Sequence, residues 1–121
     1  MLLLDTHTLL WWFDDRLPAG VTRTIATSDP VFVSAASLWE IEIKRALGKL
    51  DAPLDLIEQA EASSFSLLGI GAGHAVTAGR LPPHHRDPFD RMLVAQAIDE
   101  QLTLVSNERL LDSYEVARVW S

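Results

Sequence analysis

The chain contains no cysteine among its 121 residues. A disulfide bond, a thiolate metal site and a thiol nucleophile are therefore excluded. A protein without disulfides suits a reducing compartment. The sequence also lacks the basic start and longer apolar region of a signal peptide, and no apolar run approaches the ~20 residues that a membrane helix needs. We therefore expect a cytoplasmic protein that does not enter a membrane.

Basic residues are few, because ten Lys and Arg stand against 17 Asp and Glu, for a formal net charge of −7. A protein that binds nucleic acid usually presents a basic face, so this balance argues against such a partner. The argument fails if several acids gather in one pocket, because a cation bound there changes the sign of the local field. The positions of the acids therefore decide what the charge means.

The length and composition predict one ordinary globular domain over residues 1–121, with 48% hydrophobic and 22% charged residues. Apolar strands alternate with helices, which predicts an α/β fold, a three-layer α/β/α sandwich on a mostly parallel sheet of four to five strands. We expect strands at 2–4, 31–33, 65–68, 103–105 and 116–119. We expect helices at 7–13, 18–27, 35–47, 53–62 and 73–78, one from 88 onward, and a short one through 112. Gly48 and Gly79 should end two of these helices.

Four acidic residues occupy comparable places in this arrangement. Asp5 follows the first strand and Glu108 follows the fourth. Glu40 and Asp90 lie on largely apolar faces near the starts of two helices. In a right-handed α/β fold, the carboxyl ends of the strands and the starts of the following helices meet at one edge of the sheet. The sequence therefore predicts that these carboxylates converge.

Each of the four acids also has a purely structural explanation. Asp5 and Glu108 can cap the helices that follow them, and Asp90 favours the dipole at the start of its helix. Glu40 can pair with Lys44, which lies four residues further along the same helix. The recurrence of acids at equivalent places is what favours a shared site over four independent roles.

Carboxylates that converge at one edge repel one another, and hard divalent cations relieve that repulsion. Mg²⁺ takes oxygen ligands and retains several waters. Two such ions ~4 Å apart are the standard arrangement for the in-line attack of water on a phosphodiester. The acids therefore predict a metal-dependent hydrolase of phosphodiester bonds.

Four parts of the chain carry a resemblance that spans nearly its whole length. They are LDTHTLLW at 4–11, SLWEIEIK and LGKL at 37–44 and 47–50, DPFDRMLVAQA at 87–97 and LVSNE at 104–108. With these motifs the chain resembles PIN-domain ribonucleases, of the VapC toxin type found in bacterial toxin–antitoxin pairs. The resemblance implies an endoribonuclease that depends on Mg²⁺ or Mn²⁺ and cleaves RNA. It also implies inhibition by a cognate antitoxin protein and assembly into a homodimer.

The resemblance also assigns roles to individual residues. Asp5, Glu40 and Asp90 match the three principal acids of the family, which implies that they are catalytic and bind the metal. Glu108 stands where the family usually has Asp, so the fourth position departs from the pattern. Because Mg²⁺ tolerates little distortion, we expect the longer Glu108 side chain to act through a bound water. Thr6 and Ser106 match small hydroxyl residues that support the acids.

Three other classes of protein could place acids at the ends of strands. A receiver-type phospho-signalling domain needs an acceptor Asp after the third strand and a Lys after the fifth, but that strand ends in Leu68-Gly69 and no lysine follows Lys49. A nucleotide-binding Rossmann module needs a Gly-rich turn after the first strand, and none is present. A PIN fold kept only for binding partners stays open because Glu108 departs from the pattern.

Several side chains near the acids invite functional interpretations. His85 could contact phosphate or shuttle a proton, but we interpret it as a solvated loop histidine. Arg91 could hold an RNA phosphate or could be a solvated charge at the start of a helix. We expect Trp11, Trp12 and Trp39 to be core or subunit contacts rather than platforms for base stacking.

Overall fold

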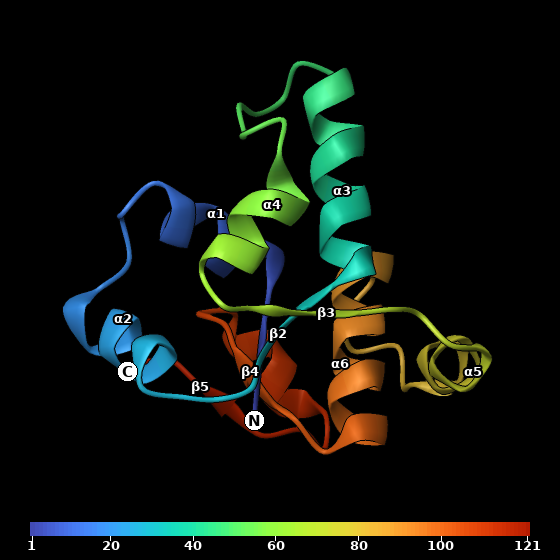
Figure 1. Cartoon of the computed structure of the whole chain (residues 1–121). Coiled ribbons are helices and arrows are strands. Elements are labelled where there is room, and N and C mark those ends of the chain that lie inside the picture. Colours follow the sequence, from blue (N-terminus) through green and yellow to red (C-terminus); the bar gives the residue numbers. More distant parts are fainter.

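The structure, a computed structural model, describes every residue from Met1 to Ser121. Five parallel strands form one sheet in the order β3-β2-β1-β4-β5 (Figure 1). The strands are β1 (Leu2–Leu4), β2 (Val31–Ser34), β3 (Ser66–Leu68), β4 (Thr103–Val105) and β5 (Arg118–Val119). The predicted α/β/α sandwich with a parallel sheet is therefore confirmed.

Helices cover both faces of the sheet. They are α1 (Thr6–Phe13), α2 (Ala19–Ala26), α3 (Ala35–Ala46), α4 (Leu56–Ala62), α5 (Ala72–Arg80), α6 (Pro88–Glu100) and the short 3₁₀ helix η1 (Arg109–Ser113). On one face, α1, α2 and α4 pack on a core that includes Leu2 and Leu4. On the other face, α6 and η1 pack on a core that includes Leu3. Successive residues of β1 thus enter opposite cores, which is why that strand is apolar throughout.

Helix α5 lies outside α6, away from the sheet (Figure 1). Its predicted end at Gly79 is wrong, because the helix continues through that glycine to Arg80. It ends there because Leu81 precedes Pro82 and takes an extended conformation, as residues before proline do. The corresponding prediction for α3 is confirmed, since Gly48 follows the helix with a positive φ of 69°.

Helix α4 begins at Leu56 rather than at the predicted Pro53. The segment before it is held by α3, where the guanidinium of Arg45 donates to the carbonyl oxygens of Ala52 and Pro53. The preceding segment stays irregular and α4 is shorter than expected.

The buried amide of Gln96 ties α6 to the carboxyl ends of two strands. Its Oε1 accepts from Ser34 Oγ at 2.5 Å, and its Nε2 donates to the Gly69 carbonyl at 3.2 Å. Gln96 is fully buried, so these bonds form where water cannot replace them. They fix the position of α6, which carries Asp90, relative to β2. None of the helices combines the length and apolar character needed to cross a membrane.

Candidate active site

Asp5 lies directly after β1 and begins α1. Its backbone N–H donates to the Val105 carbonyl on β4, and its Oδ1 accepts from Thr8 N at 2.9 Å. The side chain of Thr8 donates to the same carbonyl at 2.9 Å. Asp5 is only 5% exposed, so the cap holds a charged group in a largely buried place. The helix-cap explanation of Asp5 is confirmed, and the cap fixes where its carboxylate lies.

Glu40 reaches the same edge from α3 and is buried. Its Oε1 accepts from Thr6 Oγ1 at 2.6 Å, and its Oε2 pairs with Lys44 Nζ at 2.7 Å. Thr6 Oγ1 also lies 3.0 Å from Ser37 Oγ, a residue that sequence reasoning did not select. Thr6 therefore supports an acid, as the resemblance implies, and the predicted pairing of Glu40 with Lys44 is confirmed.

Asp90 lies in the first turn of α6, where Asp87 caps the helix. Asp87 Oδ1 accepts from the backbone N–H groups of Phe89 and Asp90, at 2.8 and 3.1 Å. Burial is the first cause that raises the pKa of Asp90, to about 6, followed by the negative charges of Asp87 and Asp5. Glu40 adds a smaller contribution in the same direction. The structure thus places the charges of Asp5 and Glu40 close enough to Asp90 to raise its pKa.

Lys44 supplies positive charge to this group of acids. Its hydrogen bond to Glu40 is the first cause that raises its pKa, and the charges of Glu40, Asp87 and Asp90 act in the same direction. The ammonium group therefore experiences three of the carboxylates at once. The sequence suggested only a helix pair four residues apart, which would not by itself connect Lys44 with α6.

Glu108 does not join the group. It is exposed, and its Oε1 accepts from Leu110 N at 3.0 Å as the N-cap of η1. Its charge raises the pKa of Arg118, after the larger effect of the Asp112 hydrogen bond, and it is not among the charges that shift Asp90. Ser106 is buried, and its Oγ accepts from Glu108 N at 3.0 Å, so it supports this backbone rather than an acid. The cap explanation of Glu108 is confirmed.

The interpretation of His85 as a solvated histidine is wrong. Its side chain is only 15% exposed, and its Nε2 lies 2.9 Å from Asp90 Oδ2. The Nδ1 atom accepts from Asp87 N at 3.2 Å, which leaves the proton of a neutral ring on Nε2. The Nε2 atom forms no aligned hydrogen bond, so its attraction to Asp90 is electrostatic. His85 lowers the pKa of Asp90, whereas burial and the neighbouring carboxylates raise it.

The interpretation of Arg91 as a solvated charge is wrong, and phosphate binding by Arg91 stays a prediction. Its guanidinium binds the chain that precedes α6. It donates to the carbonyl oxygens of Ala78, Leu81, Pro82 and His85. Tyr114 supports the same loop, because its hydroxyl donates to Pro82 O at 2.8 Å and accepts from His85 N. Arg91 therefore positions the loop that places His85 beside Asp90.

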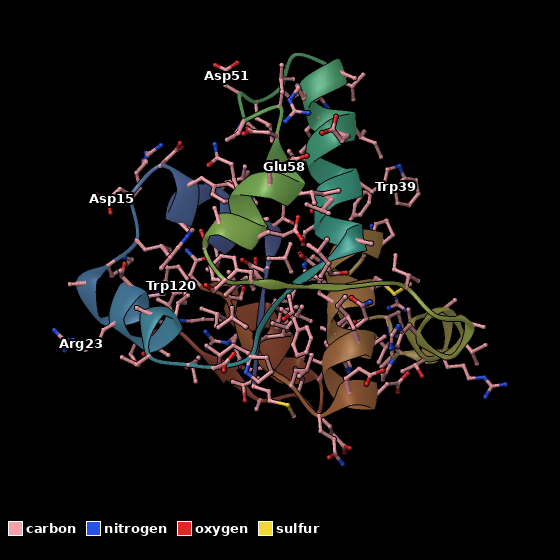
Figure 2. All side chains as sticks on the ribbon, viewed as in Figure 1. Asp15, Arg23, Trp39, Asp51, Glu58 and Trp120 are labelled. Atoms are coloured by element: carbon pink, nitrogen blue, oxygen red, sulfur yellow. The ribbon has the colours of Figure 1, made fainter.

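The tryptophans divide into two groups. Trp12 packs on Phe65 and donates from Nε1 to Ser63 Oγ at 3.0 Å, which confirms a core contact. Trp39 is 61% exposed, projects from α3 and touches Phe89 edge-on, so the core interpretation is wrong for this residue (Figure 2). A subunit contact at Trp39 stays a prediction.

In a comparison with known proteins, the family model "PIN domain" matches residues 2–116 of the chain. The chain belongs to the PIN domain family. It is 30% identical over 126 residues to Ribonuclease VapC22 of Mycobacterium tuberculosis, which covers 98% of this chain and 97% of that protein.

Two solved structures share the fold of this PIN domain. A DNA-bound VapBC from Salmonella typhimurium superposes with a TM-score of 0.74 at 19% identity, covering 99% of this chain and 98% of that one. A toxin–antitoxin complex from Klebsiella pneumoniae gives 0.70 at 15% identity, covering 98% and 96%. The family resemblance carried by the sequence motifs is therefore confirmed, and the receiver-type and Rossmann alternatives are excluded.

The donor chemistry of this PIN domain suits a hard divalent cation, since Asp5, Glu40 and Asp90 at this edge are all carboxylates. Burial and neighbouring negative charges raise the pKa of Asp90, and a bound cation would offset the effect of those charges. No three acidic or imidazole side chains converge on one point as they stand. Glu40 faces Lys44 and Asp90 faces His85, so side-chain rotation is needed to bring the oxygens together.

The raised pKa of Asp90 predicts a pH-dependent stability. The folded chain holds the Asp90 proton up to pH of about 6, whereas the unfolded chain releases it near pH 4. Stability should therefore fall as the pH rises between those values. Without divalent cations, Asp90→Asn should gain on the parent by up to about 3 kcal/mol in unfolding free energy between pH 4 and pH 7. Urea unfolding at both pH values measures this difference.

Asp51→Asn is the matched control, because Asp51 is exposed on a loop away from the acids (Figure 2). It should leave the pH dependence of the parent unchanged. If the unfolding free energies of Asp90→Asn and the parent change in parallel from pH 4 to pH 7, the pKa of Asp90 is not raised in the folded chain.

Proposed function

We propose that this PIN domain is a metal-dependent endoribonuclease and the toxin of a toxin–antitoxin pair. The observation that carries the proposal is the placement of Asp5, Glu40 and Asp90 at the carboxyl edge of the sheet, where burial and the charges of Asp87, Asp5 and Glu40 raise the pKa of Asp90. The similarity to a protein named Ribonuclease VapC22 over nearly the full length of both chains supports the choice of RNA as substrate.

Asp5, Glu40 and Asp90 are the residues that would hold Mg²⁺, with Mn²⁺ as a substitute. When bound, such an ion supplies activation of water and charge neutralisation at the phosphodiester. The chain's own residues prepare the site. The N-cap of α1 fixes Asp5, the hydroxyl of Thr6 fixes one oxygen of Glu40, and the cap of α6 fixes the turn that carries Asp90.

The proposed partners follow from the same family. We propose a cognate antitoxin protein as inhibitor, because the structural neighbours include complexes named VapBC and toxin–antitoxin complex. We also propose a homodimer and RNA as substrate, and we place the activity in the cytoplasm, where cellular RNA is available. A PIN fold kept only for binding is the alternative, and it predicts a purified protein that never cleaves RNA.

Replacing Asp5 or Asp90 by asparagine tests the proposal. Asp5→Asn and Asp90→Asn should each abolish RNA cleavage in Mg²⁺, because an amide cannot supply the negative charge that binds the cation. Both variants should fold, since asparagine also caps helices and removing one charge relieves repulsion. Cleavage assays with and without EDTA, beside thermal unfolding, measure both effects. Normal cleavage by both variants would show that these acids are not the metal ligands.

Glu108 should contribute less than the three converging acids. If it acts through a bound water, Glu108→Gln lowers the cleavage rate less than Asp90→Asn does, and Glu108→Asp keeps or raises it. Titrating the rate with Mg²⁺ separates this role from the cap of η1 seen in the structure. If Glu108 is only a cap, Glu108→Gln keeps both the rate and the metal dependence of the parent.

The antitoxin should block the acids with a basic side chain. A site of several carboxylates in a chain with a net charge of −7 favours an Arg or Lys that replaces the charge of the metal. Neutralising the basic residues in the antitoxin segment that reaches the site should restore cleavage in the complex. Unchanged inhibition by the neutralised antitoxin would count against this arrangement, provided that pull-down shows the complex still forms.

A further inference from the structure

A second potential site begins two strands away from Asp5. The strands β1, β4 and β5 end in register, and the residues that follow them are Asp5, Ser106 and Trp120. Ser106 N donates to the Val119 carbonyl at 3.2 Å, which keeps the edges of β4 and β5 together beyond the last strand residues. Because neighbouring strands lie ~4.8 Å apart, the backbones of Asp5 and Trp120 are roughly 10 Å apart.

Aromatic rings connect these two positions. The rings of Trp120 and Trp11 lie 6.0 Å apart, and those of Trp11 and His7 lie 5.8 Å apart. His7 is exposed in the first turn of α1, two residues after Asp5, and both tryptophans are partly exposed. Partly exposed rings in a row are suited to stacking of nucleobases. The row therefore extends from the first turn of α1, which begins after Asp5, to the end of β5.

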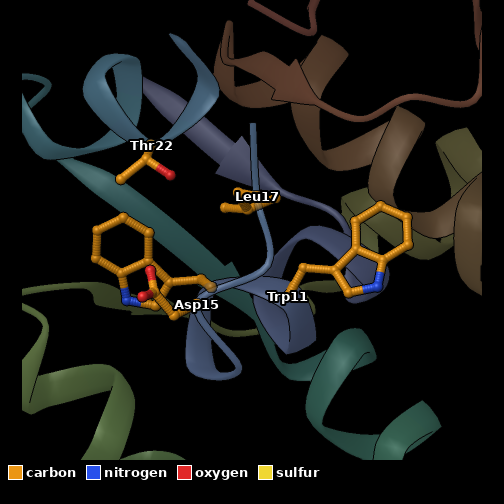
Figure 3. A pocket seen from close by; sticks show the side chains of 5 residues that line it. Trp11, Asp15, Leu17 and Thr22 are labelled. Carbon is orange, nitrogen blue, oxygen red and sulfur yellow. The ribbon is translucent and has the colours of Figure 1, made fainter. Parts of the chain in front are cut away.

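A polar pocket of about 500 Å³ adjoins Trp120 and is also lined by Asn107, Arg109 and Arg118. This volume falls within the range of small-ligand sites. Figure 3 shows a different pocket, where Leu17 lies beside Trp11 and Thr22. At about 80 Å³ that pocket is too small for such a ligand. The pocket beside Trp120 is therefore large enough to accept part of a substrate.

Arg109 is the cation of this pocket that is free to bind. Arg118 is held by both oxygens of Asp112 at 2.8 Å and by the Ser106 carbonyl at 2.9 Å. Arg109 is exposed and forms no ion pair. The pKa of Asp112 is lowered first by its Arg118 hydrogen bond and only last by Arg109. Asp112 is thus already paired with Arg118, so the guanidinium of Arg109 is available to bind a ligand.

We infer that this pocket and the aromatic row bind the nucleotides of single-stranded RNA that flank the phosphodiester at the acids. A base stacks on Trp120, and a backbone phosphate pairs with Arg109. Single-stranded RNA fits because it offers flat bases and phosphates at the same time, matching the rings and the guanidinium. The inference rests on the proposed function and adds the position of the substrate to it.

Binding of RNA without cleavage tests the inference. In the Asp90→Asn background and without divalent cations, the affinity for a fluorescent single-stranded RNA is measured by anisotropy. Adding Trp120→Leu should weaken binding about 5-fold or more, whereas Trp120→Phe should retain most of the affinity. Adding Arg109→Gln should weaken binding at low salt and reduce the slope of log K against log salt by about 0.7. Arg23→Gln, an exposed arginine on α2, is the matched control and should change nothing (Figure 2).

The possible outcomes separate this inference from the proposed function. If the parent cleaves RNA while Trp120→Leu and Arg109→Gln bind RNA as tightly as their background, the inference is wrong and the function stands. If the parent neither cleaves nor binds RNA, both fail. Loss of antitoxin binding without loss of RNA binding would assign the pocket to a protein partner and overturn the inference. Arg109→Gln removes no contact within the chain, so it decides the matter even if Trp120→Leu fails to fold.

Discussion

Repulsion among carboxylates at the carboxyl edge of the sheet is the constraint around which the site is built. Burial and the charges of Asp87 and Asp5 raise the pKa of Asp90 to about 6. Nitrogen groups of the chain lie against these acids, because Lys44 pairs with Glu40 and the imidazole Nε2 of His85 lies 2.9 Å from Asp90 Oδ2. A divalent cation at this edge would have to compete with both groups. The stability of the metal-free protein and its affinity for metal are therefore linked through the same side chains.

The caps and the site are made of the same residues. Asp5 holds the start of α1 through one oxygen, and Asp87 holds the start of α6 and thus the turn that carries Asp90. A structural role for an acid is therefore no argument against a chemical one, because the cap is what keeps the carboxylate in place. Asparagine preserves a cap while removing the charge, so amide variants separate the two roles better than alanine would.

Apolar patterning let the sequence predict the sheet, both of its covered faces and the placement of Asp5, Glu40 and Asp90 at strand ends and helix starts. Strand ends and helix starts follow from burial, and burial follows from which residues are apolar. The loop before α6 could not be predicted in this way. Arg91 binds four carbonyl oxygens there, and no residue pattern reveals where carbonyls from separate turns converge. The place of His85 depends on that loop, and the capping role of Glu108 depends on the local turn of η1.

The chain has a net charge of −7, and some of its basic side chains are already bound within the fold. Arg91 binds backbone carbonyl oxygens, and Arg118 is paired with Asp112. Few cations remain for phosphates, so binding that relied on counterion release would be weak. Stacking of bases on aromatic side chains does not require cations, because it depends on exposed ring area rather than on charge. The inferred stacking of bases on Trp11 and Trp120 would therefore suit an acidic chain, because it would not require further cations.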